Sequence, residues 1–138
     1  RAVDNAASQF TRSYNINKTD EQVARIDITQ NESGEETGTT SPIATSNSSP
    51  VGAEFEAAAI AGANGVIHSH PTTANTIAPG EGDSSIPEMG IPSYIAHGRN
   101  AIVIEISGGQ YRARSIRGRL SNHERKLIIE RLDDFQGR

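Results

Sequence analysis

Residues 101–107 read Ala-Ile-Val-Ile-Glu-Ile-Ser, and this stretch gives the clearest strand pattern in the chain. Isoleucine and valine favour the pleated, half-buried surface of a sheet. Gly108-Gly109 follows at once, and a glycine pair in this place predicts the tight turn of a β-hairpin. Residues 110–116 then form the returning strand, so the second half of the chain contains an antiparallel pair.

Two shorter strand patterns precede this hairpin. Residues 94–97 predict a brief strand. Residues 66–68 enter another, which stops at Pro71 because a proline restricts the backbone of the residue before it. Between them, residues 72–92 are rich in proline and glycine and predict a long loop. A loop of that length in a compact domain is usually functional or disordered.

The N-terminal third predicts a helix followed by two strands. The apolar residues of the helix recur at helical spacing, and they are Val3, Ala6, Ala7 and Phe10. Residues 24–28 alternate between apolar and polar, the period of a half-buried strand. Residues 31–38 are polar and hold two glycines, which predicts a turn. Residues 39–50 predict an irregular edge strand and loop, because Pro42 argues against a central strand.

Two further helices are expected. Residues 53–63 are alanine-rich and predict a helix that ends near Gly65. Ser121 opens the last helix, and with Glu124 it matches a capping box, in which each side chain caps the backbone of the other. The apolar stripe of this helix comprises Leu127, Ile128, Leu132 and Phe135. The order of elements predicts an α/β (α+β) fold, a mixed β-sheet with helices packed against it.

The composition limits the classes of protein. A length of 138 residues suggests one domain. Apolar residues make up 34% and aromatic residues 4%, so we expect a modest core and long loops. The absence of cysteine excludes disulfides, thiolate zinc sites and a cysteine nucleophile. There is no run of about 18 apolar residues, so we expect no membrane span.

The net charge of −4 is unevenly distributed. Residues 1–98 hold 4 basic and 12 acidic side chains, whereas residues 99–138 hold 9 basic and 5 acidic ones. The basic end could meet an acidic partner or nucleic acid. A solvated strand and helix face is the simpler interpretation. The cations concerned are Arg112, Arg114, Arg117, Arg119, Arg125 and Lys126.

Two histidines carry the strongest chemical signal. His68 and His70 stand two residues apart at the end of the predicted strand, just before Pro71. Side chains at this spacing point to the same face of a strand, so the two imidazoles can converge on one ion. Imidazole nitrogen suits zinc and other divalent first-row metals. We therefore predict a metal site here, zinc being the expected ion.

Asp83 is the expected third ligand. It lies in a glycine-bounded part of the long loop, and the glycines allow the loop to fold back closely. Two serines follow Asp83, which resembles a helix start that would hold the carboxylate rigidly. Two histidines and one carboxylate leave a fourth position for water, the pattern of a catalytic rather than a structural zinc site. Glu81 is an alternative ligand.

Residues 65–83 resemble the metal motif of JAB/MPN-type metalloproteases. In that motif a His-x-His-Pro strand is followed by a loop with Ser-x-x-Asp, and a glutamate lies on an earlier strand. More narrowly, the chain resembles the JAB-like domains at the C-terminal ends of bacterial polymorphic toxins, including the Rhs type. There an Ile-His-(Ser/Thr)-His-Pro run, here residues 67–71, precedes an aspartate and then a Tyr-Ile-x-x-x-Gly-like strand, here residues 94–98. The resemblance covers roughly residues 2–116 in the order of elements.

The resemblance implies a JAB/MPN-like (cytidine-deaminase-like) architecture and a zinc-dependent peptidase or isopeptidase. His68, His70 and Asp83 would hold Zn²⁺, which activates a water molecule. A glutamate at the start of the strand after the first helix would be the general base and acid. Glu21 matches that place. The alternatives lie in the polar turn and are Glu32, Glu35 and Glu36.

Two departures from the family pattern bear on activity. Residues 22–25 replace the small, glycine-containing start of the strand that commonly follows the family glutamate. Gly80 replaces the serine that would stabilise the oxyanion, and such a donor is typically worth about 10²–10³ in rate. Backbone amides of the glycine loop, or Ser69, Ser84 or Ser85, are candidate replacements. A metal-binding module without catalysis is therefore one alternative. A metal-dependent nuclease that uses the basic end is another.

The toxin resemblance also implies a biological setting. The chain, residues 1–138, would be a single JAB/MPN-like toxin domain, the C-terminal fragment of a larger protein that is secreted or delivered into a target cell. Its expected partners are a cognate immunity protein and a protein substrate in preference to nucleic acid.

Overall fold

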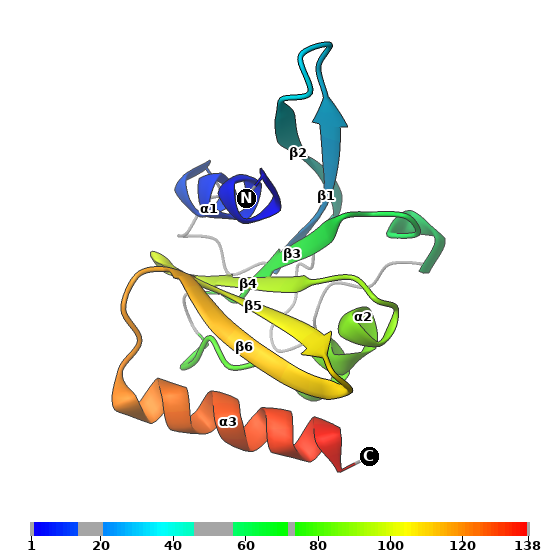
Figure 1. Ribbon diagram of the computed structural model, residues 1–138. Coiled ribbons are helices and arrows are strands. Elements are labelled where there is room, and N and C mark those ends of the chain that lie inside the picture. Colours follow the sequence, from blue (N-terminus) through cyan, green and yellow to red (C-terminus); the bar gives the residue numbers. More distant parts are fainter. Residues whose placement is uncertain (1, 14–20, 46–56, 72–73, 138) are drawn as a thin grey trace.

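The computed structural model describes residues 2–13, 21–45, 57–71 and 74–137. Within these ranges a six-stranded mixed sheet lies between helices on its two faces (Figure 1). The elements in chain order are α1 (Ala2–Ser13), β1 (Gln22–Gln30), β2 (Glu36–Thr45), the 3-10 turn η1 (Ala57–Ala59), β3 (Gly65–Ser69), the 3-10 turn η2 (Glu81–Ser84), α2 (Ser85–Glu88), β4 (Ser93–His97), β5 (Asn100–Ser107), β6 (Gln110–Arg117) and α3 (Asn122–Gln136).

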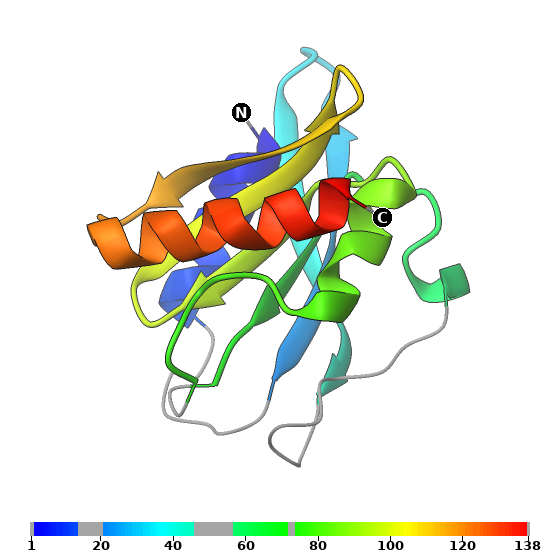
Figure 2. The same ribbon diagram turned by 90° about the horizontal axis from the view of Figure 1, so that it is seen from below.

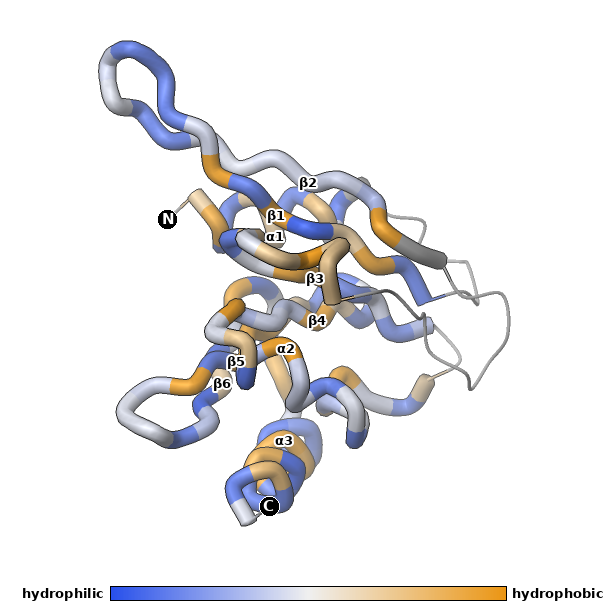
Figure 3. The backbone as a smooth tube through the Cα atoms, turned by 90° about the vertical axis from the view of Figure 1, so that its right-hand side faces the viewer, coloured by the Kyte–Doolittle hydropathy of each residue, from blue (hydrophilic) through white to orange (hydrophobic). Residues whose placement is uncertain are grey.

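The strand order is β2-β1-β3-β4-β5-β6. β3 and β4 run parallel, and every other neighbouring pair is antiparallel. The connection from β3 to β4 carries η2 and α2, so it crosses over one face of the sheet. The tip of the β1–β2 hairpin extends beyond the rest of the sheet and is hydrophilic (Figure 3). This arrangement leaves β2 and β6 as the edge strands.

Helix α1 packs on one face of the sheet. Its Ala6 and Ala7 are buried against a cluster formed by Ala24, Ile26, Ile67, Tyr94, Ala96 and Val103. Gly38 of β2 permits this close approach, because a Cβ there would lie 2.7 Å from the backbone oxygen of Ala2. Asp4 adds a polar tie, since its carboxylate accepts hydrogen bonds from the Tyr94 hydroxyl at 2.5 Å and from Arg114 at 2.8 Å.

Helices α2 and α3 cover the opposite face (Figure 2). Here the apolar stripe of α3 packs on the sheet and on the segment before η2, in a cluster of Ile77, Ala78, Ile95, Ile102, Ile104, Ile128, Leu132 and Phe135. A neighbouring cluster joins α2 to β1 and β3 through Val23, Ile60, Val66, Ile86 and Ile91. No helix in the described ranges is both long enough and apolar enough to cross a membrane.

Most of the predicted elements are confirmed. The glycine hairpin is present, with positive φ at both Gly108 and Gly109 (60° and 76°), as its turn type requires. The strand that contains Pro42 lies at the edge of the sheet, and its register shifts beside that proline. The predicted stripe of the last helix faces the core.

Three predictions need correction. The helix predicted for residues 53–63 is absent from 57 onward, where the chain forms only η1 and a turn, while residues 53–56 lie outside the described ranges. The turn predicted for residues 31–38 ends sooner, since β2 begins at Glu36. The loop predicted for residues 72–92 contains η2 and α2 in its described part.

Candidate metal centre

The two predicted histidines lie side by side. His68 is on β3 and His70 follows the end of that strand, and their Nε2 atoms are 3.3 Å apart. The apolar residues before them, Val66 and Ile67, are fully buried and fix the strand in the middle of the sheet. His68 is itself only 3% exposed. The strand therefore presents two imidazoles to the face that α2 and α3 cover.

Asp83 folds back to the same point. It lies in η2, and its Oδ2 atom is 3.4 Å from His68 Nε2 and 3.9 Å from His70 Nε2. The backbone N–H of Gly80 donates to this oxygen at 2.7 Å, which fixes the carboxylate. The ligand positions predicted from the sequence are thus brought together. Glu81, the alternative ligand, is exposed and is not part of the cluster.

The three side chains fit a zinc ion. Their ligand atoms all lie within 4.8 Å of one another. Ligands bonded to zinc at about 2.0–2.1 Å in a tetrahedron lie about 3.3 Å apart. Two of the three separations match that value closely, at 3.3 Å and 3.4 Å. The donor set of two imidazoles and one carboxylate is also one that catalytic zinc sites use.

A hydrogen bond selects the tautomer of His70. Its Nδ1 lies 2.8 Å from the carbonyl oxygen of Thr76, which can only accept, so Nδ1 carries the proton. In the neutral ring Nε2 then has a free lone pair, as metal binding requires. The same histidine nitrogen is the one that faces His68 and Asp83.

A contact from α3 supports this arrangement. Glu124 accepts a hydrogen bond from the Thr76 hydroxyl at 2.6 Å and another from the Ile77 backbone N–H at 2.9 Å. Arg131, about two turns further along the same face of the helix, donates to the Pro79 carbonyl at 2.7 Å. Helix α3 therefore holds the segment between the two ligand-bearing regions at two places.

Sequence reasoning missed this role of Glu124. The sequence predicts that its side chain completes a capping box with Ser121. Half of that box is present, because the Ser121 side chain accepts from the Glu124 N–H at 3.1 Å. Both carboxylate oxygens of Glu124, however, are taken up by residues 76 and 77. The capping box was the only signal at Glu124 in the sequence, and it predicted a contact with the nearby Ser121 rather than with residues 76 and 77.

The electrostatics of the cluster are strongly coupled. Burial raises the pKa of Asp83, but the charge and hydrogen bond of His68, the proximity of His70 and the hydrogen bond from the Gly80 N–H outweigh this and hold the pKa well below its usual range. Burial lowers the pKa of His68, but Asp83 and, more weakly, Glu21 raise it above its ordinary value. Without a metal, the cluster therefore favours an ion pair between His68 and Asp83.

The candidate glutamates occupy two ends of β1. Val23 pairs with His68, and the Gln22 N–H donates to the Ser69 hydroxyl at 3.0 Å, so the register carried one step further sets Glu21 opposite His70. The alternatives Glu32, Glu35 and Glu36 lie at the other end of this nine-residue strand. Such a strand spans about 30 Å. Only Glu21 is therefore near the histidines.

The other two histidines lie apart from the metal cluster. His97 Nε2 is 3.0 Å from the carbonyl oxygen of Ala74, at the end of β4. His123 lies exposed in the first turn of α3. Glu105 on β5 contacts Arg114 at 3.3 Å. Comparison with protein-family models, with curated proteins and with solved structures found no match for this chain.

Proposed function

We propose that this protein is a zinc-dependent hydrolase of the JAB/MPN-like kind, which cleaves amide or isopeptide bonds. The observation that carries the proposal is the cluster of His68, His70 and Asp83, in which two of the three ligand-atom separations match a tetrahedral site. The mixed sheet with helices on both faces is compatible with that architecture.

In this proposal the chain's own residues have distinct tasks. His68, His70 and Asp83 hold the zinc ion. A zinc ion in such a site supplies Lewis-acid activation of water at neutral pH. Glu21 accepts the proton that the water loses and delivers it to the leaving amine. The strand register, extended beyond the last paired residues, would set Glu21 opposite His70, and Glu21 also raises the pKa of His68; both observations support this assignment.

Oxyanion stabilisation is the weakest part of the proposed site. The Ser85 hydroxyl already donates to the Gly82 carbonyl at 3.0 Å, whereas the Ser69 hydroxyl accepts from the Gln22 N–H and keeps its own O–H as a donor. The Gly80 N–H is engaged by Asp83. These contacts favour the alternative of a metal-binding module with slow or no turnover. A serine at position 80 has room, because a Cβ there would lie 3.7 Å from Asp83 Oδ2.

The test combines metal content with bond cleavage. Zinc-loaded protein is incubated with a panel of linear and isopeptide-linked peptides, and products are identified by mass spectrometry. We expect cleavage by the wild type, none by Glu21→Gln, and equal zinc in both. Gly80→Ser should raise turnover. If both the wild type and Gly80→Ser bind zinc but cleave no peptide, the protein is a metal-binding module without catalysis. If the protein binds no zinc, the proposal is rejected entirely.

The toxin setting is a second part of the proposal and rests on the sequence resemblance. The chain would be delivered into a target cell as the terminal piece of a secreted protein, and the producer would make an immunity protein that neutralises it. Expression of the chain with and without the product of a neighbouring gene tests this. A plasmid-nicking assay tests the nuclease alternative, for which the basic side chains of β6 and α3 are the supporting observation.

A further inference from the structure

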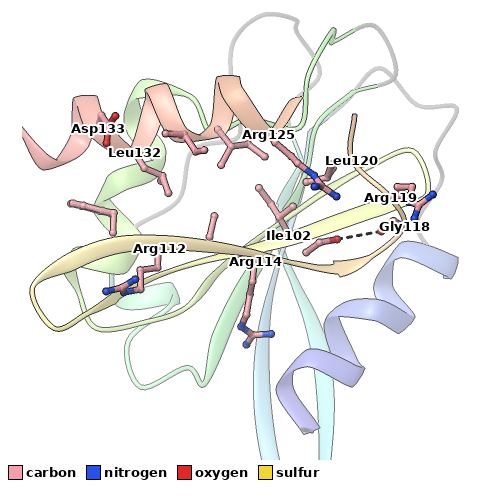
Figure 4. A pocket seen from close by; sticks show the side chains of 14 residues that line it. Ile102, Arg112, Arg114, Gly118, Arg119, Leu120, Arg125, Leu132 and Asp133 are labelled. Atoms are coloured by element: carbon pink, nitrogen blue, oxygen red, sulfur yellow. Dashed lines mark hydrogen bonds between the residues drawn. The ribbon is translucent and has the colours of Figure 1, made fainter. Parts of the chain in front are cut away.

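A second site lies away from the metal cluster, between the edge strand β6 and helix α3. The space between them has a volume of about 660 Å³. We call it the β6–α3 groove. Figure 4 shows Ile102 of the sheet and Leu132 of the helix directed into it. Its apolar lining is formed by Ile102, Ala113, Leu120, Ile128, Ile129 and Leu132. Ile129 remains 59% exposed, unusually high for a large apolar side chain.

The backbone of β6 faces this groove without a strand neighbour. β6 is the last strand of the sheet, so among the described residues one side of its backbone has no strand to pair with. The Tyr111 N–H shows which residues point outward, because it donates to the Gln136 side chain at 2.9 Å rather than to β5. The direction of N–H and C=O alternates along a strand. The backbone groups of Ala113 and Ser115 therefore also point out of the sheet.

α3 covers only one end of this edge. Gln136 caps Tyr111 and also donates to the Gly109 carbonyl at 3.0 Å, so the end of the groove beside the hairpin is closed. Further along β6, the groove residues Ala113 and Ser115 have no backbone partner from α3 among the described hydrogen bonds. Exposed strand edges of this kind pair readily with another extended chain.

The charge at the open end is positive. Arg119 and Arg125 line the groove there, beside Leu120, whereas Asp133 lies at the opposite end (Figure 4). Neither arginine forms an ion pair with a carboxylate in the described part of the chain. Arg114 differs, because Asp4 and Glu105 already hold it and it points away from α3. The groove therefore offers two cations together at one end.

We propose that the β6–α3 groove binds an extended acidic segment of a partner protein, which adds to β6 as a further strand. The backbone of Ala113 and Ser115 would pair with the segment, and its apolar side chains would occupy the space beside Leu120 and Leu132. Strand addition uses main-chain hydrogen bonds for affinity and side-chain pockets for specificity. Carboxylates of the segment would meet Arg119 and Arg125.

A nucleic acid fits this groove less well. Proteins that hold a phosphate backbone commonly contact several phosphates, on the order of 6–10. Among the described residues, only three arginines without an ion pair line the groove, namely Arg112, Arg119 and Arg125, and its floor is apolar. No residue of the metal cluster lines the groove, so this proposal stands whether or not the proposed hydrolase activity is correct.

The test begins with a displayed library of short random peptides, panned against the wild-type protein. We expect enrichment of peptides that combine β-branched residues with at least two carboxylates. A selected peptide is then titrated by fluorescence anisotropy. The double variant Arg119→Glu/Arg125→Glu should weaken binding roughly 2–30-fold, the range expected for the loss of two exposed ion pairs. Arg12→Glu, the same charge reversal on α1, should leave binding unchanged.

A second variant tests strand addition itself. Ala113→Pro removes an outward N–H, and an edge strand tolerates proline at such a position. It should weaken peptide binding about fivefold, the value of one hydrogen bond, without loss of far-UV circular dichroism. Peptide binding should also slow hydrogen exchange at Ala113 and Ser115. The proposal is overturned if no peptide is enriched, or if the selected peptide binds both variants as tightly as it binds the wild type. It is also overturned if only DNA or RNA binds at the groove.

Discussion

At the scale of single residues, His70 connects the metal site to the rest of the chain. Its Nε2 faces His68 and Asp83, while its Nδ1 is bonded to the Thr76 carbonyl. A ring held at both nitrogens has one orientation and one tautomer, so no reorganisation is needed when a metal binds. This is the arrangement that raises the affinity of histidine sites.

Removal of this ligand should abolish tight zinc binding. Loss of an outer partner of a metal ligand typically costs about 10–100-fold in affinity, so His70→Ala, which removes a ligand itself, should cost more than that. Isothermal titration of the apoprotein with zinc measures the change. The matched control is His123→Ala, an exposed histidine on α3, which should bind like the wild type. Equal zinc affinity in the two variants would remove His70 from the site.

The shifted pKa values of His68 and Asp83 predict how the stability of the apoprotein and its affinity for zinc depend on pH. In the apoprotein, the raised pKa of His68 adds stability that is present below its ordinary value of 6.5 and is lost as the pH rises through the raised value. The lowered pKa of Asp83 adds stability that is present above 3.8 and is lost as the pH falls. Urea unfolding of the apoprotein should therefore show the contribution of the pair most strongly between these two values.

The affinity for zinc should increase with pH, whereas the contribution of His68 to the stability of the apoprotein decreases. Zinc needs neutral His68, so protons compete with the metal, and the affinity should rise as the pH increases through the raised pKa of His68. Asp83→Asn removes both the charge that raises the pKa of His68 and the carboxyl group whose own pKa is lowered. In that variant the apoprotein should lose the extra stability between 3.8 and 6.5. A wild-type profile identical to that of Asp83→Asn would show that the two side chains do not interact.

At the scale of elements, α3 acts on the metal site without contributing a ligand. Glu124 holds Thr76 and Ile77, and Thr76 in turn orients His70. Glu124→Ala should therefore lower zinc affinity about tenfold, the lower end of the range for an outer partner. It should also change the visible spectrum of the cobalt-substituted protein, which a purely structural role would not do.

The controls for this prediction lie on the same helix. Glu130→Ala removes an exposed carboxylate of α3 and should leave affinity and spectrum unchanged. Glu124→Gln keeps one acceptor oxygen and should restore part of the affinity. An altered melting temperature with unchanged zinc affinity in Glu124→Ala would assign that residue to stability alone.

The sequence was a good guide to elements whose partners are local. The hairpin at Gly108-Gly109 and the stripe of α3 follow from turn chemistry and periodicity, and both are present. The alanine-rich segment was predicted wrongly because a distant side chain competes for its backbone. Arg25 donates to the carbonyl oxygens of Ala59 at 3.0 Å and Ala61 at 3.3 Å, so these groups do not serve a helix.

The candidate site could likewise be predicted where it depends on local sequence, but not where it depends on distant residues. The strand period places His68 and His70 together, and the spacing of glycines indicated that Asp83 returns to them. The contacts that fix the ligands could not be predicted, because they join residues about fifty positions apart. Glu124 reaches Thr76 across 48 residues, and Arg131 reaches Pro79 across 52.

At the scale of the whole molecule, the face of the sheet that α2 and α3 cover carries two sites with different charge and chemistry. The metal cluster lies where β3 meets the crossover segment, and the β6–α3 groove lies at the far edge of the sheet. Helix α3 borders both. It holds the crossover segment through Glu124 and Arg131, and it lines the groove through Arg125 and Leu132.

Zinc should stabilise the entire domain, because its ligands join β3 to η2. A ligand that binds only the native state at 100 times its dissociation constant adds about 2.7 kcal/mol. For a domain of this size that corresponds to a rise in melting temperature of roughly 10 °C. Differential scanning calorimetry with zinc, and then with a chelator, measures the rise and its reversal. A melting temperature that changes with neither zinc nor the chelator would mean that no metal bridges these two elements.

The position of α3 in the chain also has a consequence for biosynthesis. The two side chains that grip the crossover segment, Glu124 and Arg131, come after all six strands. A ribosome therefore releases the histidines and Asp83 well before it releases the residues that immobilise them. Until α3 has emerged, the contacts of Glu124 and Arg131 with residues 76–79 cannot form, so the metal site becomes rigid later than the strand that carries His68.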